Sequence, residues 1–505
     1  MNIIVFKFYN FLIKRGLILL LNPFIFSQSL ISSNSLELPL NKLFFDLNYK
    51  INEDKRELKV DSYYFSIEYK NQFSFNNGHS NIDNEAEYYS PGSFTNFSST
   101  RFEIENQWLK LEVEPYAISH KEIFNNSPVY GTFQSANYHN VSYLIDKLKI
   151  GFRQSRIVLH YKGFGIAYGN MSHWWGPGFH SSLALSSNAE SQKTYSIGTF
   201  KDINMGPFSF YSQVIVMPYE SNSGTKLYFS GLKSHIKYHS KSSIITLGLH
   251  RTYLSGNFDN LSSITNNINT WSLKDALSLV IEPLFGESKR NLDYSRPGTP
   301  GFDAWDEVLT GYVKILFPEY NFEVYIDVAS DDNRANLTDL KAHWDHTLAY
   351  QLGSKIFTKF NKFTLFTGIE FTTTRISNTF NPAFYRGGPN TPNFYTKPLY
   401  DYFTYNGRRM GAHSGSSSDD LIIMLGLGNH TFASFISYNK ERHGIKSKRY
   451  TEVKTELSLS LRRKVFKHGS VFITLENEKI KNYAFIENNI SKSKLIWLGY
   501  SFLIN

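Results

Sequence analysis

The sequence contains no cysteine, so a lipid-modified cysteine cannot anchor the chain behind an N-terminal leader. Beyond its N-terminal end the chain also lacks any apolar run of the length that a membrane-spanning helix needs, which excludes a helical membrane protein. The formal net charge is +9, but the cations are dispersed among 44 acidic residues and form no block beside a nucleic-acid motif. Nucleic acid is therefore not expected as a partner.

A signal peptide is predicted for residues 1–27. Lys7, Lys14 and Arg15 precede the short apolar run 16–21. A run this short behind basic residues suits secretion better than a permanent anchor helix, which is the alternative. Removal of this segment takes away three cations and no acid, so the mature net charge is 9 − 3 = +6. We expect an exported protein.

The composition favours one large closed β-barrel over several soluble domains. Aromatic residues make up 16% of the chain, while the mean hydropathy is only −0.33. A transmembrane barrel places its apolar residues at every second position, so its mean hydropathy resembles that of a soluble protein. A large soluble β-sandwich or β-propeller also alternates and is the competing interpretation.

Alternation is clearest in residues 451–462. Successive side chains of a strand point to opposite faces, so this segment has one apolar and one charged face. The apolar face is predicted to meet lipid through Val453, Leu457, Leu459 and Leu461, and the charged face to line the lumen through Glu452, Lys454 and Glu456. Further strands are indicated at 109–114, 322–328 and in a hairpin over 421–438.

The end of the chain has the pattern of a closing barrel strand. In segment 495–505 every second side chain is apolar and lies on the same face of the strand, namely Ile496, Leu498, Tyr500, Phe502 and Ile504. The connection at 467–470 is tight and the next one, about 479–493, is long and polar. Short periplasmic turns, long external loops and a last strand that ends at the periplasm are typical of outer-membrane barrels. The fold class predicted is all-β, a transmembrane antiparallel β-barrel.

One segment is specific enough to suggest a family. Residues 169–189 combine paired tryptophans, Gly-Pro-Gly and an apolar run that ends in Ser-Asn-Ala. With the blocks at 323–332, 344–353 and 405–420, which follow in order, this segment resembles the family of capsule assembly protein Wzi. The resemblance covers the chain from roughly residue 108 to its end.

The resemblance implies an outer-membrane barrel of about eighteen strands that binds capsular or other extracellular polysaccharide and helps to attach or assemble it at the cell surface. Such a protein is lectin-like, monomeric, surrounded by outer-membrane lipid and without a cofactor. A helical region before the barrel is typical of the family, but residues 36–69 show no helical periodicity. We therefore divide the mature chain into an N-terminal region of strand and loop, 28–107, and a barrel, 108–505.

The family segment supplies the candidate binding residues. Polysaccharide contacts are expected from Asn170, His173, Trp174, Trp175 and Asn188. Aromatic faces can cover the apolar face of a sugar ring, and the asparagines can bond hydroxyls. The alternative is packing inside the barrel, since adjacent strand residues point in opposite directions. Gly176, Pro177 and Gly178 are expected to form a structural turn that directs one Trp ring to the interior.

Other chemistries are less well supported. His173 and His180 lie near Ser172, Ser181 and Ser182, but no Gly-x-Ser-x-Gly element is present, so no catalytic residue is predicted. Two acidic groups, 331–333 and 419–420, could hold calcium in external loops, although their spacing matches no established calcium loop and solvated turns are favoured. No metal site is therefore assigned. An outer-membrane porin or specific solute channel remains the alternative function.

Overall fold

The computed structural model describes most of the chain after residue 63. The described residues are 64–78, 83–85, 87, 93–120, 148–220, 226–256, 306–331, 348–375, 394–395, 403–406, 408–445, 448–466 and 468–504. Within them, no helix is long and apolar enough to cross a membrane.

Long antiparallel strands make up nearly all of the described structure. They are β1 (Tyr64–Asn76), β2 (Ser93–Glu105), β3 (Leu109–His120), β4 (Leu148–Tyr161), β5 (Phe164–Met171), β6 (Gln192–Thr199), β7 (Ile203–Met205), β8 (Phe208–Glu220), β9 (Lys226–His239), β10 (Ile244–Gly256), β11 (Asp306–Phe317), β12 (Phe322–Asp331), β13 (Leu348–Phe360), β14 (Phe363–Thr373), β17 (Asp419–Gly428), β18 (Phe432–His443), β19 (Glu452–Phe466), β20 (Gly469–Lys481) and β21 (Ile490–Ile504). A small hairpin, β15 (Thr404–Tyr405) with β16 (Arg408–Arg409), and the single turn η5 (Tyr483–Phe485) complete the elements.

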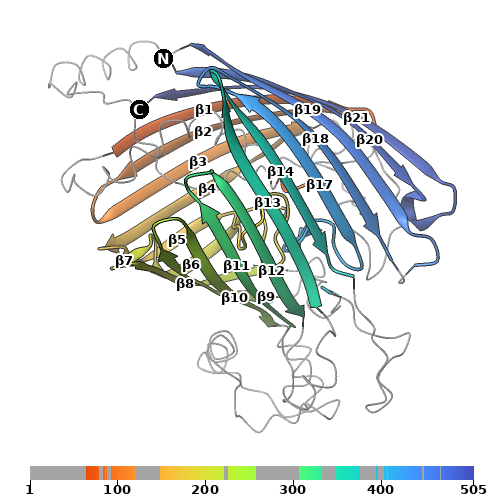
Figure 1. The fold of residues 1–505 in the computed structure, drawn as a ribbon. Helices are drawn as coiled ribbons and strands as arrows, with labels where there is room; N and C mark the ends of the chain where they lie inside the picture. The colour runs from red at the N-terminus through yellow and green to blue at the C-terminus, as the bar shows by residue number, and fades with distance from the viewer. Residues whose placement is uncertain are drawn as a thin grey trace, which may run out of the picture.

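The sheet closes on itself. Apart from β6 and β7, each strand of the wall pairs with the next wall strand along the chain, β14 with β17, and β1 pairs with both β2 and β21. The short strands β6 and β7 both pair with β8, so they share one position in the wall. The nineteen strands of the sheet thus form a closed barrel of eighteen positions (Figure 1). Closure removes the unpaired edges that would otherwise face lipid.

The two ends of the barrel differ in their connections. At one end the strands are joined by tight turns, such as 162–163, 361–362 and 429–431. At the other end the connections are long, and 172–191 is an example. β1 starts and β21 ends at the short-turn end, since Tyr64 pairs with Glu105 beside the turn at 106–108 and Ile504 pairs with Ile67. Short turns mark the periplasmic end of such barrels, so the long connections are extracellular.

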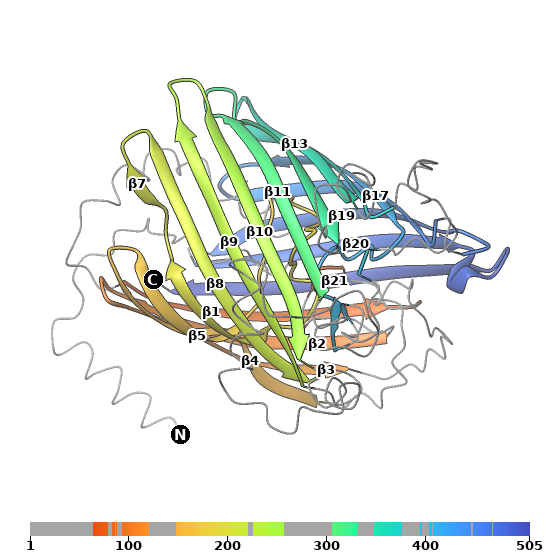
Figure 2. The same cartoon turned by 90° about the horizontal axis from the view of Figure 1, so that it is seen from below.

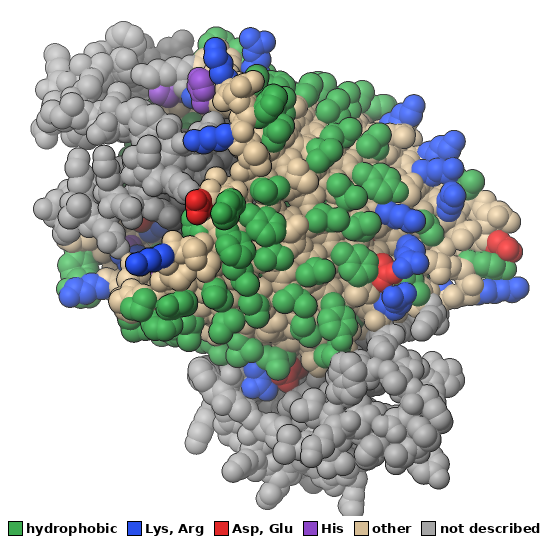
Figure 3. Space-filling view, in the orientation of Figure 1, with side chains coloured by type: hydrophobic (Ala, Val, Ile, Leu, Met, Phe, Trp, Pro, Cys, Tyr) green, Lys and Arg blue, Asp and Glu red, His purple; other side chains and the backbone are tan. Residues whose placement is uncertain are grey.

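The outer face of the wall is an apolar band. Leu457 and Leu459 are 50% and 38% exposed, whereas Glu452 and Lys454 on the same strand are 2% and 1% exposed. The predicted register of this strand is confirmed, as is the outward face of β21. Figure 3 shows hydrophobic side chains covering the middle of the wall, with charged side chains beyond it. A charge at mid-bilayer on this face would cost about 2–4 kcal/mol.

Buried charges line the inside of the wall in pairs. Glu112 accepts hydrogen bonds from Arg101 and Arg156, and Lys110 Nζ lies 2.7 Å from Glu103. Glu323 lies 2.7 Å from Lys355. Each of these acids faces an opposite charge, which compensates for its removal from water.

The barrel begins earlier than the sequence suggested. The boundary was placed at residue 108, but β1 and β2 are barrel strands and β1 closes the wall against β21. The outward side chains of β2 include Asn96, Ser98 and Thr100, so its lipid-facing side is not uniformly apolar. The predicted signal peptide, residues 1–27, lies outside the described residues.

Candidate functional site

Residues 172–191 leave the wall between β5 and β6 and fold into the lumen (Figure 2). Their path doubles back, because the Trp175 N–H donates to the Leu185 carbonyl at 2.8 Å and the two residues form an isolated bridge. Nearly every side chain from Trp174 to Ala189 is buried. We call this segment, together with the described residues 83–87 and 394–418 that pack against it, the luminal plug.

Glu370 on β14 fixes the plug to the wall. Its carboxylate accepts hydrogen bonds from three consecutive backbone N–H groups, those of Phe179 (2.7 Å), His180 (3.3 Å) and Ser181 (2.7 Å). The Tyr325 hydroxyl donates to the same carboxylate. Glu370 is 1% exposed, so its charge is stabilised by these donors and not by water.

A histidine pair makes a second attachment. Nε2 of His180 lies 3.3 Å from Asp420 on β17, and Nε2 of His413 lies 3.2 Å from the same carboxylate. Asn439 on β18 donates to Asp420 at 2.6 Å. Burial alone would lower the pKa of His180, but the carboxylate of Asp420 raises it to about 9. His180 is therefore a cation bound to a wall anion at neutral pH.

The same three side chains, His180, His413 and Asp420, lie close enough together to hold a metal ion. Their hydrogen bonds describe a different arrangement. The Asn84 side-chain amide donates to the His180 carbonyl at 2.8 Å and also lies 3.2 Å from Nδ1 of His413. The Asp420 carboxylate also accepts from Asn439. His180, His413 and Asp420 are thus each in contact with an asparagine of the plug or the wall.

The connection between β14 and β17 covers the first plug segment. The Ser186 N–H donates to the Met410 carbonyl at 2.6 Å, and the Asn188 amide donates to the Arg409 carbonyl at 3.0 Å. The Arg408 guanidinium in turn donates to Asn188 at 2.7 Å. Because these groups are buried, each bond replaces one that water would otherwise make.

The connection between β1 and β2 supplies the third part of the plug. The Asn84 N–H donates to the Asn188 side chain at 3.2 Å, and the Ser187 hydroxyl donates to the Asn84 carbonyl at 3.1 Å. Asp83 forms an ion pair with Lys454 on β19, whose Nζ also lies 2.8 Å from Glu441. Three extracellular connections far apart in the chain thus meet at one place inside the barrel.

The two tryptophans lie inside the plug. Trp174 donates from Nε1 to the Gly178 carbonyl at 2.9 Å and is 7% exposed. Trp175 is 1% exposed and its ring lies 5.7 Å from that of His250. A Cβ on Gly231 would come within 2.5 Å of the Trp175 ring, so glycine is required there for close approach. Gly176 has a φ of 147°, as expected for a bend.

The other candidate residues divide between wall and plug. Asn170 is on β5, and its amide donates to the Phe152 carbonyl at 3.1 Å. His173 lies 3.1 Å from the Thr194 hydroxyl, and burial lowers its pKa to about 3. Asn188 is completely buried at the centre of the plug. Trp174, Trp175, His173 and Asn188 are therefore brought together in one packed unit, whereas Asn170 stays in the wall. Glycan contact by any of them stays a prediction.

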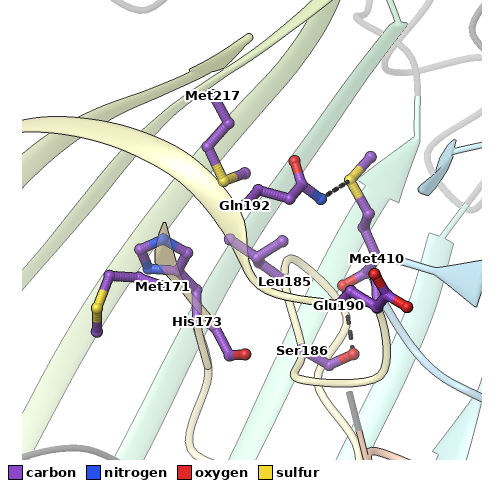
Figure 4. A pocket seen from close by; sticks show the side chains of 10 residues that line it. Met171, His173, Leu185, Ser186, Glu190, Gln192, Met217 and Met410 are labelled. Carbon is purple, nitrogen blue, oxygen red and sulfur yellow. Dashed lines mark hydrogen bonds between the residues drawn. The ribbon is translucent and has the colours of Figure 1, made fainter. Parts of the chain in front are cut away.

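A small cavity of about 10 Å³ lies beside the plug. Figure 4 shows three methionines, Met171, Met217 and Met410, around it with His173 and Gln192. Pockets for drug-sized ligands have volumes of about 300–1,000 Å³, so this cavity is small for an oligosaccharide.

The acidic pairs considered for calcium have protein partners. Asp331 accepts a hydrogen bond from the Tyr395 N–H at 2.5 Å. Asp419 pairs with Arg442 and lies 3.8 Å from Arg375. These carboxylates hold connections to the wall.

Sequence reasoning missed Glu370, Gln351 and Asn84. Glu370 is an inward acid in an alternating strand, and many such acids occur in this chain. The blocks at 405–415 and 419–420 did carry a signal, because they were among the segments that resemble the family. Their resemblance to the family singled out the part of the plug that packs on residues 172–191, but it did not predict that the two segments are in contact.

The sequence and the fold were compared with known proteins. No curated protein matches the chain. Among solved structures, Wzi of Escherichia coli, described as an outer-membrane protein involved in group 1 capsule assembly and a carbohydrate-binding β-barrel, is 12% identical, with a TM-score of 0.58 over 94% of this chain and 89% of that one. At this identity the likeness shows the fold alone.

Two further structures are more distant. OccAB3 of Acinetobacter baumannii is 7% identical, with a TM-score of 0.43 over 88% of this chain and 100% of that one. OpdK of Pseudomonas aeruginosa is 8% identical, with a TM-score of 0.43 over 87% and 98%. The fold is that of an outer-membrane β-barrel, and the chain is an outer-membrane protein. Residues 51–268 of the 505-residue chain match the model of the family described as capsule assembly protein Wzi.

Proposed function

We propose that the protein binds capsular or other extracellular polysaccharide at the cell surface and helps to attach or assemble it there. The observation that carries this proposal is the plug. Described parts of three extracellular connections fold inward and bond to one another and to the wall. Outer connections that are fixed from below provide a rigid surface for a long polymer.

The match of residues 51–268 to the family model supports the same function, since Wzi of Escherichia coli, which has a similar fold, is described as carbohydrate-binding and involved in capsule assembly. We propose that Trp174, Trp175, His173 and Asn188 contribute by holding the plug in shape, so that their effect on polysaccharide is indirect. In this proposal the barrel is a monomer surrounded by outer-membrane lipid.

The protein is proposed to bind without catalysis. Ser182 and the histidines beside it have other partners: the Ser182 hydroxyl donates to the Trp175 carbonyl, and His173 faces Thr194. His180 faces Asp420. A hydrolytic triad would need a histidine next to a serine nucleophile, and these contacts give each group another partner.

The test is capsule retention in a deletion strain. Complementation with the wild-type gene is expected to restore surface polysaccharide, and the purified barrel is expected to retain that polysaccharide on a glycan array. A solute channel would instead give a steady ion conductance in planar bilayers and would leave surface polysaccharide unchanged. That pair of results would reject the proposal.

A further inference from the structure

A patch of cations lies on the outward face of the wall at its extracellular end. Its members are Lys440 and Arg442 on β18, Lys479 and Lys481 on β20, and Lys492 and Lys494 on β21. We call these six residues the basic patch. They share the parity of the lipid-facing side chains Ile436, Leu475 and Ile496, so they project outward and not into the lumen. Figure 3 shows blue side chains gathered beyond the apolar band on this side.

The strand register places the patch directly above the apolar band. Lys440 pairs with Thr455, Thr455 with Lys479 and Lys479 with Lys492, so three of the lysines belong to one row across four strands. Lys494 occupies the next row down, opposite Asn477. The row below that consists of Ile436, Leu459, Leu475 and Ile496.

The charge of the patch is not balanced within the described part of the chain. Arg442 pairs with Asp419, but none of the five lysines has a carboxylate partner among the described residues. Elsewhere near this end, Arg251 lies 2.6 Å from Glu307 and Lys226 stands opposite Glu220. Lys193 on β6 is an outward lysine on another part of the wall, but five such lysines gather only in the basic patch within the described residues.

The position of the basic patch at the extracellular end of the apolar band indicates what kind of ligand it binds. An apolar band that ends in a row of lysines marks the boundary between acyl chains and headgroups, and lysine stems reach along an apolar surface to place their charge in that boundary. The long connections make this the outer leaflet. Each cation near anionic headgroups contributes about 1 kcal/mol of attraction. A bound lipid could lay its acyl chains on the row of Ile436 to Ile496 while the lysines hold its phosphates.

We propose that the basic patch is a binding site for the phosphorylated headgroup of an outer-leaflet glycolipid of the lipid A type. A soluble acidic polysaccharide would also be attracted by lysines, but it would have no use for the apolar row beneath them. The position of the cations on the outside of the wall, away from the plug and the lumen, favours the lipid.

The experiment uses the full-length barrel refolded in detergent free of lipopolysaccharide. The test variant is Lys479→Gln/Lys492→Gln/Lys494→Gln. The matched control is Lys241→Gln/Lys359→Gln/Lys362→Gln, which removes three exposed lysines at the periplasmic turns. All six substitutions are at surface positions, and heat-modifiable migration verifies that each barrel is folded. Bound lipid is counted by native mass spectrometry during titration with diphosphorylated lipid A and with lipid A from which the phosphates have been removed.

The wild type and the control are expected to bind phosphorylated lipid A alike. The test variant is expected to bind about 100-fold more weakly, since each lysine contributes about fivefold. Equal binding by the test variant, equal loss in the control, or equal binding of the dephosphorylated lipid would overturn the proposal. Loss of binding to a soluble acidic polysaccharide with lipid A binding unchanged would also overturn it and would assign the patch to polymer.

Discussion

The carboxylate of Glu370 gives the sharpest test of how the plug is held. In Glu370→Gln one oxygen becomes an amide nitrogen, which cannot accept a hydrogen bond. Oε2 accepts hydrogen bonds from the Phe179 N–H and the Tyr325 hydroxyl, while Oε1 accepts hydrogen bonds from the Ser181 N–H and the Gln351 amide. Whichever oxygen is replaced, two buried donors lose their acceptor. At about 1–3 kcal/mol for each unsatisfied group, docking of the plug weakens by about 2–6 kcal/mol.

The assay measures the plug and the wall separately. Undocking is expected to open the lumen, so Glu370→Gln should raise ion conductance in planar bilayers and make the plug segment cleavable by an added protease. The barrel itself should still migrate as a heat-modifiable species, because β14 keeps its pairing with β13 and β17. The matched control is Glu103→Gln, which removes an equally buried carboxylate that pairs with Lys110 in the wall. Wild-type conductance and protease resistance in Glu370→Gln would refute the reasoning.

Three other predictions follow from the plug and the wall. Trp175→Ala should lower the folding stability by about 3–5 kcal/mol and reduce both the amount of folded barrel and the surface polysaccharide. An unchanged amount of barrel with reduced polysaccharide would indicate direct glycan contact, and both quantities are measured in the same cells. Because the folded-state pKa of His180 is raised to about 9 from an unfolded value near 6.5, its contribution to plug stability should be complete below pH 6.5 and lost as the pH rises through 9; protease protection measured from pH 6 to 10 should show this loss, and Asp420→Asn should flatten it. The mature protein should fractionate with the outer membrane and migrate as a heat-modifiable barrel, and recovery as a soluble periplasmic protein would contradict the fold.

The wall could be predicted from the sequence because its rules are local. Alternation in 451–462 depends only on neighbouring residues, and it correctly placed Leu457 outside and Lys454 inside. Alternation did not predict β2, because Asn96, Ser98 and Thr100 lie on its outward face, where a lipid-facing strand usually has apolar residues. A strand whose outward face is polar along its middle gives only a weak period of two.

The plug could not be predicted in the same way, because its contacts are remote in the chain. Glu370 meets Phe179 across 191 positions, and Asn84 meets His413 across 329. The paired tryptophans suggested that one ring points in and one out, as adjacent strand residues do. Both are buried, because residues 172–191 leave the wall and surround each ring with protein. Family resemblance identified the right segment, while its partners became visible only in three dimensions.

The seam between β1 and β21 has a consequence for biogenesis. Ile67 pairs with Ile504 and Asn76 with Leu495, so the last hydrogen bonds of the wall join segments from nearly opposite ends of the polypeptide. Until both strands have crossed the inner membrane, the growing sheet has two open edges that would readily pair with other chains. The plug, which needs residues from 83 to 418, cannot be enclosed before this moment either. The wall can therefore close only when the chain from β1 to β21 is present in the sheet.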